Sequence, residues 1–348
     1  MGALKSNPGN FFEDFHIGMD ITHATPLTVS EGDVSLYRAL TGSRHALYSS
    51  SVFAKANGFN ALPLDPLLAF HVVFGKSVPD ISLNAVANLG YAEGVFKKPV
   101  VPGDTLRAVS TVIGLKQNSS GKTGVVYVRT RGLNPAGEDV LSFARWVMVN
   151  KKDPASPAPD PVVPELSAAV PATNLTCPNY SAWDDALAGS PFRYEDYEVG
   201  DKINHVDGMT VEEAEHQIAT RLYQNTAKVH FDAHGQKDSR FGKRLIYGGV
   251  VISIARALSF NGLANAAEIL AINAGSHTAP LFAGDTIYAW SEVLDKAELS
   301  ENAGALRLRL VAVKDQDPGA FALRGEDGKY APGVLLDFDY WAAIPKRG

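Results

Sequence analysis

The sequence contains a single cysteine, Cys177, among 348 residues, so no disulfide can form within the chain. Such sparse use of cysteine is typical of a reducing compartment, and we expect a cytoplasmic protein. Residues 1–15 lack the apolar segment of a signal peptide, and the longer apolar runs are interrupted by charge, as Arg256 interrupts residues 250–260. The sequence therefore predicts neither secretion nor a membrane-spanning segment.

Positive charge is also scarce. The 32 Lys and Arg residues are outnumbered by 38 Asp and Glu residues, and no extended basic patch is present. A polyanion would not be attracted over a long range, so we expect no nucleic-acid partner. No Cys/His or His/carboxylate spacing resembles a metal site, and no glycine-rich strand-turn-helix resembles a phosphate-binding loop. The sequence predicts no metal and no separate cofactor.

An internal repeat is the main feature of what is present. Residues 12–48 resemble residues 194–230 at a constant offset of 182, and the two copies open with FEDFHIGMDITH and YEDYEVGDKINH. Further on, PVVPGDTL at 99–106 matches PLFAGDTI at 280–287. Colinear matches of this extent predict two copies of one domain on a single chain.

The repeat sets the expected domain boundaries. We place an N-terminal domain at residues 1–150 and a C-terminal domain at residues 191–348. Between them, residues 151–190 are rich in proline, which favours extended backbone and predicts a stiff linker. Apolar residues such as Val162 and Val170 suggest that this linker packs partly along the surface, although a disordered linker is the alternative.

Each copy is expected to contain a short helix, a long apolar helix and several strands. The pattern T-V-x-E at Thr28 and at Thr210 predicts a capping box at the start of each short helix. The long helices are expected at residues 66–77 and 248–262, and alternating segments such as 305–313 predict strands. Because the strands follow the helices without alternating with them, the fold class should be α+β with antiparallel strands.

The two copies differ where chemistry is expected. The second copy has His230 where the first has Tyr48, and Gly248 where the first has Pro66. Glycine lets a ligand approach the amides at a helix start, whereas proline has no amide to donate. Gly248 and Gly249 could therefore bind a developing negative charge, although close packing of helix on sheet explains them equally well.

These residues carry a family resemblance. His230 and Asp232, followed by Phe241, Gly242, Leu245 and Gly248, resemble the motifs of the MaoC-like hotdog hydratases, which hydrate enoyl-CoA thioesters. The resemblance implies a tandem hotdog fold, in which each half is a long helix wrapped by an antiparallel sheet. It also implies a catalytic C-terminal copy and a degenerate N-terminal copy that helps to form the acyl pocket. Hotdog proteins commonly form homodimers, which the resemblance allows here.

A longer resemblance narrows the expected substrate. Strings such as FHVVFGKSVPDISLNAVANLGYAEG, ARALSFNGLANA and the terminal DFDYW are similar to the hydratases of 2-methylfumaryl-CoA, which act in bacterial acetate assimilation. The likeness implies reversible hydration of 2-methylfumaryl-CoA to β-methylmalyl-CoA, with CoA as part of the substrate. A hotdog thioesterase and a catalytically inactive acyl-CoA-binding module are the alternatives.

One position departs from the family motif. Asn225 lies five residues before His230, where the hydratases have an aspartate, and an amide cannot accept a proton at neutral pH. Either His230 transfers the proton alone while Asn225 orients water, or Asp232 or a substrate carboxylate supplies the second group, or the site binds without turnover. Asn225 could also simply cap a helix.

Several further residues are candidates for substrate binding. The phosphates of CoA require cations, and a dicarboxylic acyl group requires another cation inside the pocket. The expected substrate-binding residues are Arg44 for the acyl carboxylate, together with Asp232, Arg240, Lys243, Arg244 and Tyr247.

Overall fold

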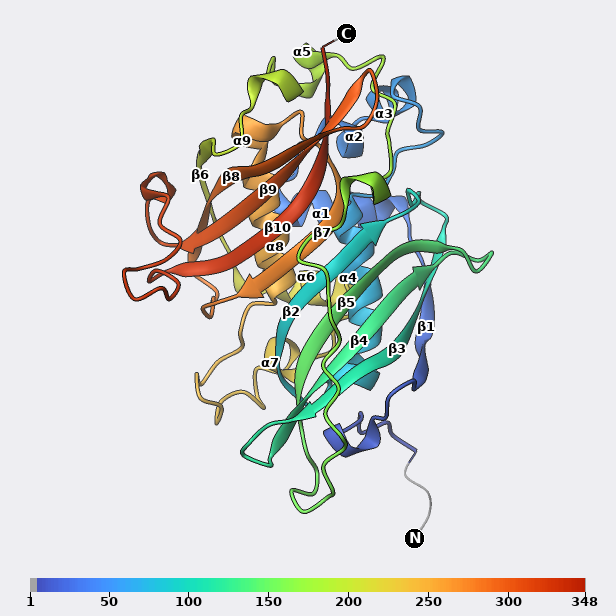
Figure 1. Ribbon diagram of the computed structural model, residues 1–348, viewed down its shortest axis with the longest axis vertical. Helices are drawn as coiled ribbons and strands as arrows, with labels where there is room; N and C mark the ends of the chain where they lie inside the picture. The colour runs from blue at the N-terminus through green and yellow to red at the C-terminus, as the bar shows by residue number, and fades with distance from the viewer. Residues whose placement is uncertain (1–4, 348) are drawn as a thin grey trace.

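One continuous sheet of ten antiparallel strands forms the body of the computed structural model, which describes residues 5–347 (Figure 1). The strand order is β1-β3-β4-β5-β2-β7-β10-β9-β8-β6. The strands are β1 (Asp20–Thr28), β2 (Ala85–Phe96), β3 (Thr105–Gln117), β4 (Thr123–Leu133), β5 (Asp139–Asn150), β6 (Lys202–Thr210), β7 (Glu268–His277), β8 (Thr286–Glu298), β9 (Ala303–Lys314) and β10 (Val334–Pro345).

The helices lie in two groups that follow the repeat. The first group is α1 (Glu31–Thr41), α2 (Ala46–Ser49), α3 (Ser51–Ala56) and α4 (Pro66–Ser77). The second group is α5 (Asp185–Ala188), α6 (Glu213–Leu222), α7 (Lys228–Phe231), α8 (Gly248–Leu258) and α9 (Phe260–Leu263). Among the described residues, no helix is long and apolar enough to cross a membrane.

The repeat is visible in the sheet as an approximate two-fold arrangement. From the centre outward, the order β2-β5-β4-β3-β1 in one half matches β7-β10-β9-β8-β6 in the other. Strands β2 and β7 pair directly, with Ala92 opposite Ala274, two positions separated by the repeat offset. The α+β class with antiparallel strands is therefore confirmed.

The two long helices, α4 and α8, are buried against the sheet. Almost every residue of each is buried, which explains why both helices are rich in apolar residues. Helix α4 begins with Pro66, and the Asp65 side chain accepts a hydrogen bond from the Leu67 amide at 2.9 Å. Helix α8 begins with Gly248, and no side chain caps it. The two helix starts therefore differ in the amides that they leave available.

The short helices begin two residues later than the T-V-x-E pattern predicts. Thr28 and Thr210 are the last residues of strands, and their hydroxyls bond Thr105 and Thr286 across the sheet. The capping pairs are Ser30 with Asp33 and Glu212 with Glu215. The T-V-x-E pattern is therefore shared by the two copies because its threonine is the last residue of a strand in each.

The second long helix also ends earlier than expected, at Leu258. Asn261 and Gly262 leave helical backbone geometry, and Gly262 takes a φ of 103° that favours glycine. The prediction that this helix extends to residue 262 was therefore wrong by four residues.

The linker follows the outer face of the sheet (Figure 1). Val162 forms a two-way backbone bridge to Leu115 of β3, at 2.8 and 2.9 Å. Farther on, the Val170 carbonyl accepts a hydrogen bond from Trp341 Nε1 at 3.0 Å, and Val170 itself is buried. The segment therefore packs against strands of both halves, as its apolar residues suggested.

Gly75 in α4 is a close contact between the halves and gives a stability prediction. A Cβ added to Gly75 would lie 1.8 Å from the carbonyl oxygen of Tyr223, which is backbone that cannot rotate away. We expect Gly75→Ala to reduce the free energy of unfolding by about 3 kcal/mol, measured by urea titration. Gly32→Ala in α1 is the matched control, because its nearest neighbour is Ser30 Oγ at 3.3 Å. Equal effects of the two changes would contradict the packing argument.

Candidate active site

A cavity of about 200 Å³ lies between the two halves of the molecule. Its wall combines residues of β2, β5 and α4 from the N-terminal half with residues 225–251 and the end of β7 from the C-terminal half. The polar lining residues used below are Asn88, Tyr91, Arg145, Asn225, His230, Tyr247 and His277, and Gly248 lines it as well.

His230 in α7 is held as a neutral base. Its Nδ1 donates to the carbonyl oxygen of Leu245 at 2.9 Å, and this fixes both the ring orientation and the tautomer. Among the described residues no group bonds Nε2, so this nitrogen is free to accept a proton from a ligand in the cavity. Burial lowers the pKa of His230 to about 4, so the ring is uncharged at neutral pH. The ring is therefore ready to act as a general base.

Asn225 lies in the turn between α6 and α7 and lines the same cavity. Its side chain is buried, and Oδ1 accepts a hydrogen bond from the Ala227 amide at 3.1 Å. The left-handed residue at this helix end is Gln224, with φ 54°, and not Asn225. Asn225 thus stabilises the turn through Oδ1, and its Nδ2 group is left to donate to a ligand or a water.

Gly248 is the first residue of α8 and lines the cavity, whereas Gly249 does not. The first amides of a helix have no partner within the helix, so the Gly248 amide can donate to a ligand atom. A Cβ on Gly248 would lie 2.4 Å from the His277 ring, and one on Gly249 would lie 2.7 Å from the His71 ring. Close packing thus requires both glycines, and only Gly248 also faces the cavity.

Tyr247 precedes α8 and lies beside the histidine. Its ring centroid is 5.4 Å from that of His230, and its amide donates to His216 Nε2 at 3.0 Å. Burial raises the pKa of Tyr247 well above its usual value, so the hydroxyl keeps its proton. No described residue makes a hydrogen bond of full geometry to that hydroxyl, and the Asn225 amide lies near enough to lower its pKa slightly. Tyr247 is therefore available as a neutral donor.

The structure places Arg44 and Asp232 outside the cavity. Arg44 is exposed, and its guanidinium lies 4.7 Å from the ring centroid of Phe260. Asp232 is exposed and accepts a hydrogen bond from the Gly235 amide at 2.9 Å, which closes a local turn. The expectation that Arg44 supplies the cation inside the pocket does not fit this position.

The basic cluster before α8 also lies outside the cavity wall. Arg244 pairs with Glu213 and Gln217, which leaves little of its charge for a ligand. Arg240 and Lys243 are exposed and lie over aromatic rings at 5.2 and 4.2 Å. A role for these two in binding CoA phosphates remains a prediction.

Sequence reasoning missed Arg145, Tyr91 and His277. Tyr91 Oη lies 3.4 Å from His277 Nε2, and both side chains line the cavity. Arg145 is fully buried on β5 and shares the inward face of that strand with Phe143 and Val147. A charged residue at an inward position of an alternating strand is unusual, and this pattern was the available signal.

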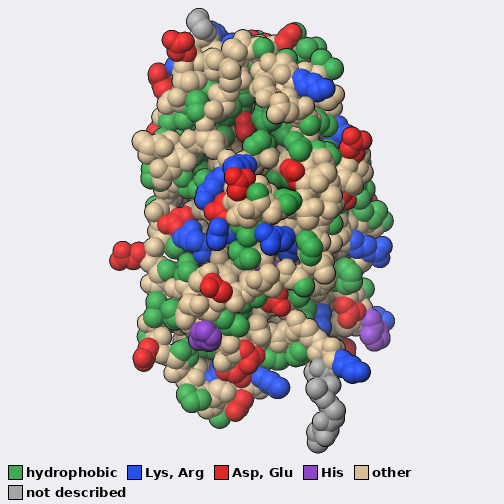
Figure 2. Space-filling view, turned by 90° about the vertical axis from the view of Figure 1, so that its right-hand side faces the viewer, with side chains coloured by type: hydrophobic (Ala, Val, Ile, Leu, Met, Phe, Trp, Pro, Cys, Tyr) green, Lys and Arg blue, Asp and Glu red, His purple; other side chains and the backbone are tan. Residues whose placement is uncertain are grey.

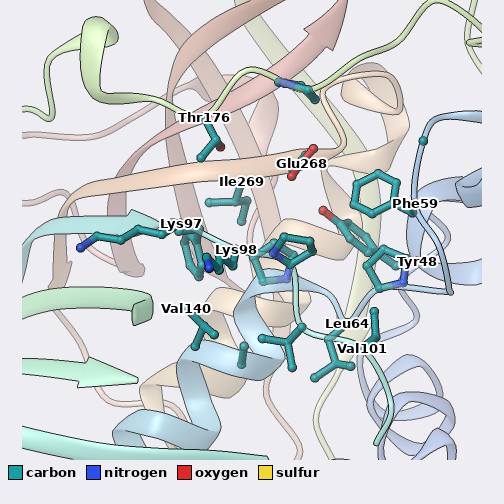
Figure 3. Close-up of a pocket in the computed structure, with 18 of the residues that line it drawn as sticks. Tyr48, Phe59, Leu64, Lys97, Lys98, Val101, Val140, Thr176, Glu268 and Ile269 are labelled. Carbon is teal, nitrogen blue, oxygen red and sulfur yellow. The ribbon is translucent and has the colours of Figure 1, made fainter. Parts of the chain in front are cut away.

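A second cavity, of about 440 Å³, occupies the equivalent position in the other half (Figure 3). Tyr48 and Pro66 line it where His230 and Gly248 line the first. Glu268 of β7 also lines it, and burial raises the pKa of Glu268 to about 7. Despite its size, this cavity has neither an imidazole base nor a free amide at its helix start.

Lys97 and Lys98 at the edge of the second cavity are already paired. Lys97 binds Asp139 at 2.8 Å and Lys98 binds Glu138 at 2.6 Å. Figure 2 shows Lys and Arg side chains gathered across the middle of one face, with Asp and Glu side chains among them. The charges of Lys97 and Lys98 are thus balanced by acidic neighbours. Exposed ion pairs of this kind contribute little to stability.

Comparisons with known proteins agree with this geometry. A profile of the mesaconyl-CoA hydratase family matches residues 3–325. The chain is 64% identical over 347 residues to a mesaconyl-CoA hydratase from Cereibacter sphaeroides, covering 99% of this chain and 100% of that one. It is 59% identical to a β-methylmalyl-CoA dehydratase from Chloroflexus aurantiacus, with the same coverage.

Solved structures show the same fold. A putative MaoC domain dehydratase from Chloroflexus aurantiacus has a TM-score of 0.97 at 58% identity, covering 99% of this chain and 100% of that one. A conserved protein from Mycobacterium tuberculosis, described as a double hotdog, has a TM-score of 0.77 at 25% identity and covers 97% of this chain and 99% of that one. The expected tandem hotdog fold is thus confirmed, and the chain belongs to the mesaconyl-CoA hydratase family.

Proposed function

We propose that the protein is a lyase that reversibly hydrates 2-methylfumaryl-CoA to β-methylmalyl-CoA. The names of its full-length relatives support this substrate. The observation that carries the chemistry is the position of one neutral imidazole, with Nε2 free, in the same cavity as the unpartnered first amide of a buried helix. The N-terminal half supplies part of the cavity wall and no base.

The reaction divides between these two groups. The Gly248 amide donates to the thioester carbonyl, where negative charge develops as water adds to the conjugated double bond. His230 Nε2 accepts a proton from the water while its oxygen bonds to Cβ and the π electrons move onto the thioester. The protonated His230 then returns that proton to Cα. One histidine therefore acts first as base and then as acid.

Asn225 acts on the water and not on the proton. Its free Nδ2 group donates to the water oxygen and leaves the water protons directed towards His230. Because the amide cannot take a proton, and because Asp232 is exposed and does not line the cavity, we follow the alternative in which His230 transfers the proton alone.

The direct test is a spectrophotometric assay with a panel of enoyl-CoA thioesters that includes 2-methylfumaryl-CoA. We expect the enoyl-thioester absorbance to fall with 2-methylfumaryl-CoA and to reach the same equilibrium from β-methylmalyl-CoA. Release of free CoA would instead identify a thioesterase. Tight binding of every thioester without any change in absorbance would identify an inactive binding module.

Asn225→Asp tests the departure from the family motif. The carboxylate would add a second proton acceptor, and it would repel the free carboxylate of 2-methylfumaryl-CoA. We expect kcat/KM to rise about tenfold with crotonyl-CoA and to fall with 2-methylfumaryl-CoA. A tenfold change corresponds to about 1.4 kcal/mol in transition-state stabilisation. Asn225→Ala is the control and should slow both substrates. An Asp variant that slows both equally would contradict the role of the amide in substrate choice.

A further inference from the structure

Arg145 is a fully buried guanidinium without an acidic partner among the described residues. Its Nη2 donates to Ser77 Oγ at 2.7 Å, and its Nη1 lies 3.5 Å from Ser82 Oγ. The guanidinium carbon lies 4.2 Å from the ring centroid of Phe74, and Nε has no partner. All its polar contacts are therefore with neutral hydroxyls. A buried charge in this state is costly unless a counter-ion arrives.

Arg256 of α8 shows what a structural arginine looks like in this fold. Its guanidinium is equally buried, and it donates to His45 Nε2 at 2.9 Å, Ser259 Oγ at 2.7 Å and the Ala267 carbonyl at 3.0 Å. It also lies over an aromatic ring, that of Tyr340, at 5.7 Å. The contrast is that Arg256 has close acceptors on several sides, whereas Arg145 has one close hydroxyl and a free Nε.

Other unpaired polar atoms accompany Arg145 in the cavity wall. Both side-chain atoms of Asn88 and the hydroxyl of Tyr247 are buried without partners among the described residues. All three residues line the cavity that contains His230. A guanidinium, an amide NH₂ and a phenol hydroxyl are donors, so this wall is suited to an acceptor with more than one oxygen.

We propose that Arg145, with Asn88 and Tyr247, forms a carboxylate subsite that binds the free carboxylate of the dicarboxylic acyl group. This inference rests on the proposed function and takes over the role that sequence reasoning gave to Arg44. Burial lowers the pKa of Arg145 to about 10, so the guanidinium remains charged at neutral pH. In 2-methylfumaryl-CoA the free carboxylate is attached to the carbon that receives water. Pairing it with Arg145 offsets the negative charge beside the carbon that water attacks, so the subsite acts on kcat as well as on KM.

The test compares two substrates that differ only at the carboxylate. These are 2-methylfumaryl-CoA and (E)-2-methylbut-2-enoyl-CoA, which has a methyl group in its place. For Arg145→Met we expect kcat/KM for 2-methylfumaryl-CoA, divided by kcat/KM for the methyl analogue, to fall about 100-fold. The buried guanidinium disfavours a ligand that leaves it unpaired, and methionine removes that discrimination. Arg145→Lys should recover part of the ratio. A ratio unchanged in Arg145→Met would overturn the proposal.

Stability separates this role from a structural one. Replacing an unpaired buried charge by a side chain of similar volume should leave the Tm of the free protein unchanged or raise it. Arg256→Met is the matched control and should lower the Tm and slow both substrates in parallel. A Tm for Arg145→Met that falls as far as that of Arg256→Met would assign Arg145 to the structure instead.

Measuring the affinity for each thioester tests the carboxylate subsite independently of catalytic activity. Calorimetric titration of the wild type and of Arg145→Met with both thioesters should show a selective loss of affinity for 2-methylfumaryl-CoA. If the wild type failed to hydrate either thioester, the proposed function would be wrong, while this titration would still decide the subsite. Equal affinities of the wild type for the two thioesters would exclude it.

Discussion

His230→Gln is expected to lower kcat for hydration by about 10³-fold while the protein stays folded. Glutamine can still donate to the Leu245 carbonyl, but it has no nitrogen that accepts a proton at neutral pH. Loss of a general acid–base group typically costs 10² to 10⁴ in rate, and here one residue serves both steps. Steady-state kinetics with 2-methylfumaryl-CoA would measure the effect, with circular dichroism and Tm to verify the fold.

The matched control is His234→Gln, which changes an exposed histidine four residues farther along the chain. It should leave kcat within twofold of the wild type. The pH profile supplies a second readout, because the pKa of His230 is lowered to about 4. Hydration needs the neutral ring, so kcat/KM should be flat from pH 8 to pH 5.5, above the range in which acid unfolds the protein. An inflection near pH 6.5 would show that His230 does not titrate as the buried base.

Acid should destabilise the protein steeply between pH 6.5 and about 4. Burial lowers the pKa of six histidines below the unfolded value of about 6.5, and that of His45 falls well below it. The values are about 3 for His71 and His216 and about 4 for His205, His230 and His277. In this window the unfolded chain binds protons that the folded chain excludes, so the free energy of unfolding decreases as the pH falls.

Two buried acids oppose this effect. Burial raises the pKa of Asp65 to about 6 and that of Glu268 to about 7, so the folded chain holds protons that the unfolded chain releases. Their contribution is present at low pH and is lost as the pH rises through these values. Six histidines against two acids leave a net uptake of about four protons on unfolding, or roughly 5 kcal/mol per pH unit near pH 5.

Urea titrations at pH 7.5, 6.0 and 5.0 would measure this dependence. His205→Gln should reduce the slope of the free energy of unfolding against pH by about one proton, because it removes one histidine of lowered pKa. His205 lies outside the cavity, where its Nε2 bonds Ser291 Oγ at 2.8 Å. A free energy of unfolding that stays constant from pH 7 to pH 5 would contradict the burial of these neutral rings.

Much of the fold follows from patterns that the sequence displays directly. The repeat offset predicted two copies of one domain, and the structure joins them in one sheet with Ala92 opposite Ala274 at its centre. The starts of α4 and α8 coincide with the proline and the glycine that distinguish the copies. The caps of the short helices were misplaced because Thr28 and Thr210 satisfy strand geometry, which the T-V-x-E pattern alone does not distinguish from a cap.

The site was predictable only where the two copies differ. His230 and Gly248 stand out against Tyr48 and Pro66, and the structure brings both into one cavity. Arg145 could not be placed, because its function depends on which face of β5 is covered and by which residues of the other half. Arg44 lines neither cavity, and its guanidinium lies over the Phe260 ring instead.

The different starts of α4 and α8 have a consequence for how such a site can arise. In an assembly of two identical subunits, a substitution at a helix start appears in both copies, so a proline that rigidifies one helix removes the reactive amide from the other. Fusion into one polypeptide breaks that identity. Here α4 begins with Pro66 and is capped by an aspartate, whereas α8 begins with Gly248, which lines the cavity and has no side-chain cap. A single chain can therefore carry two helix starts of different chemistry, which two identical subunits cannot.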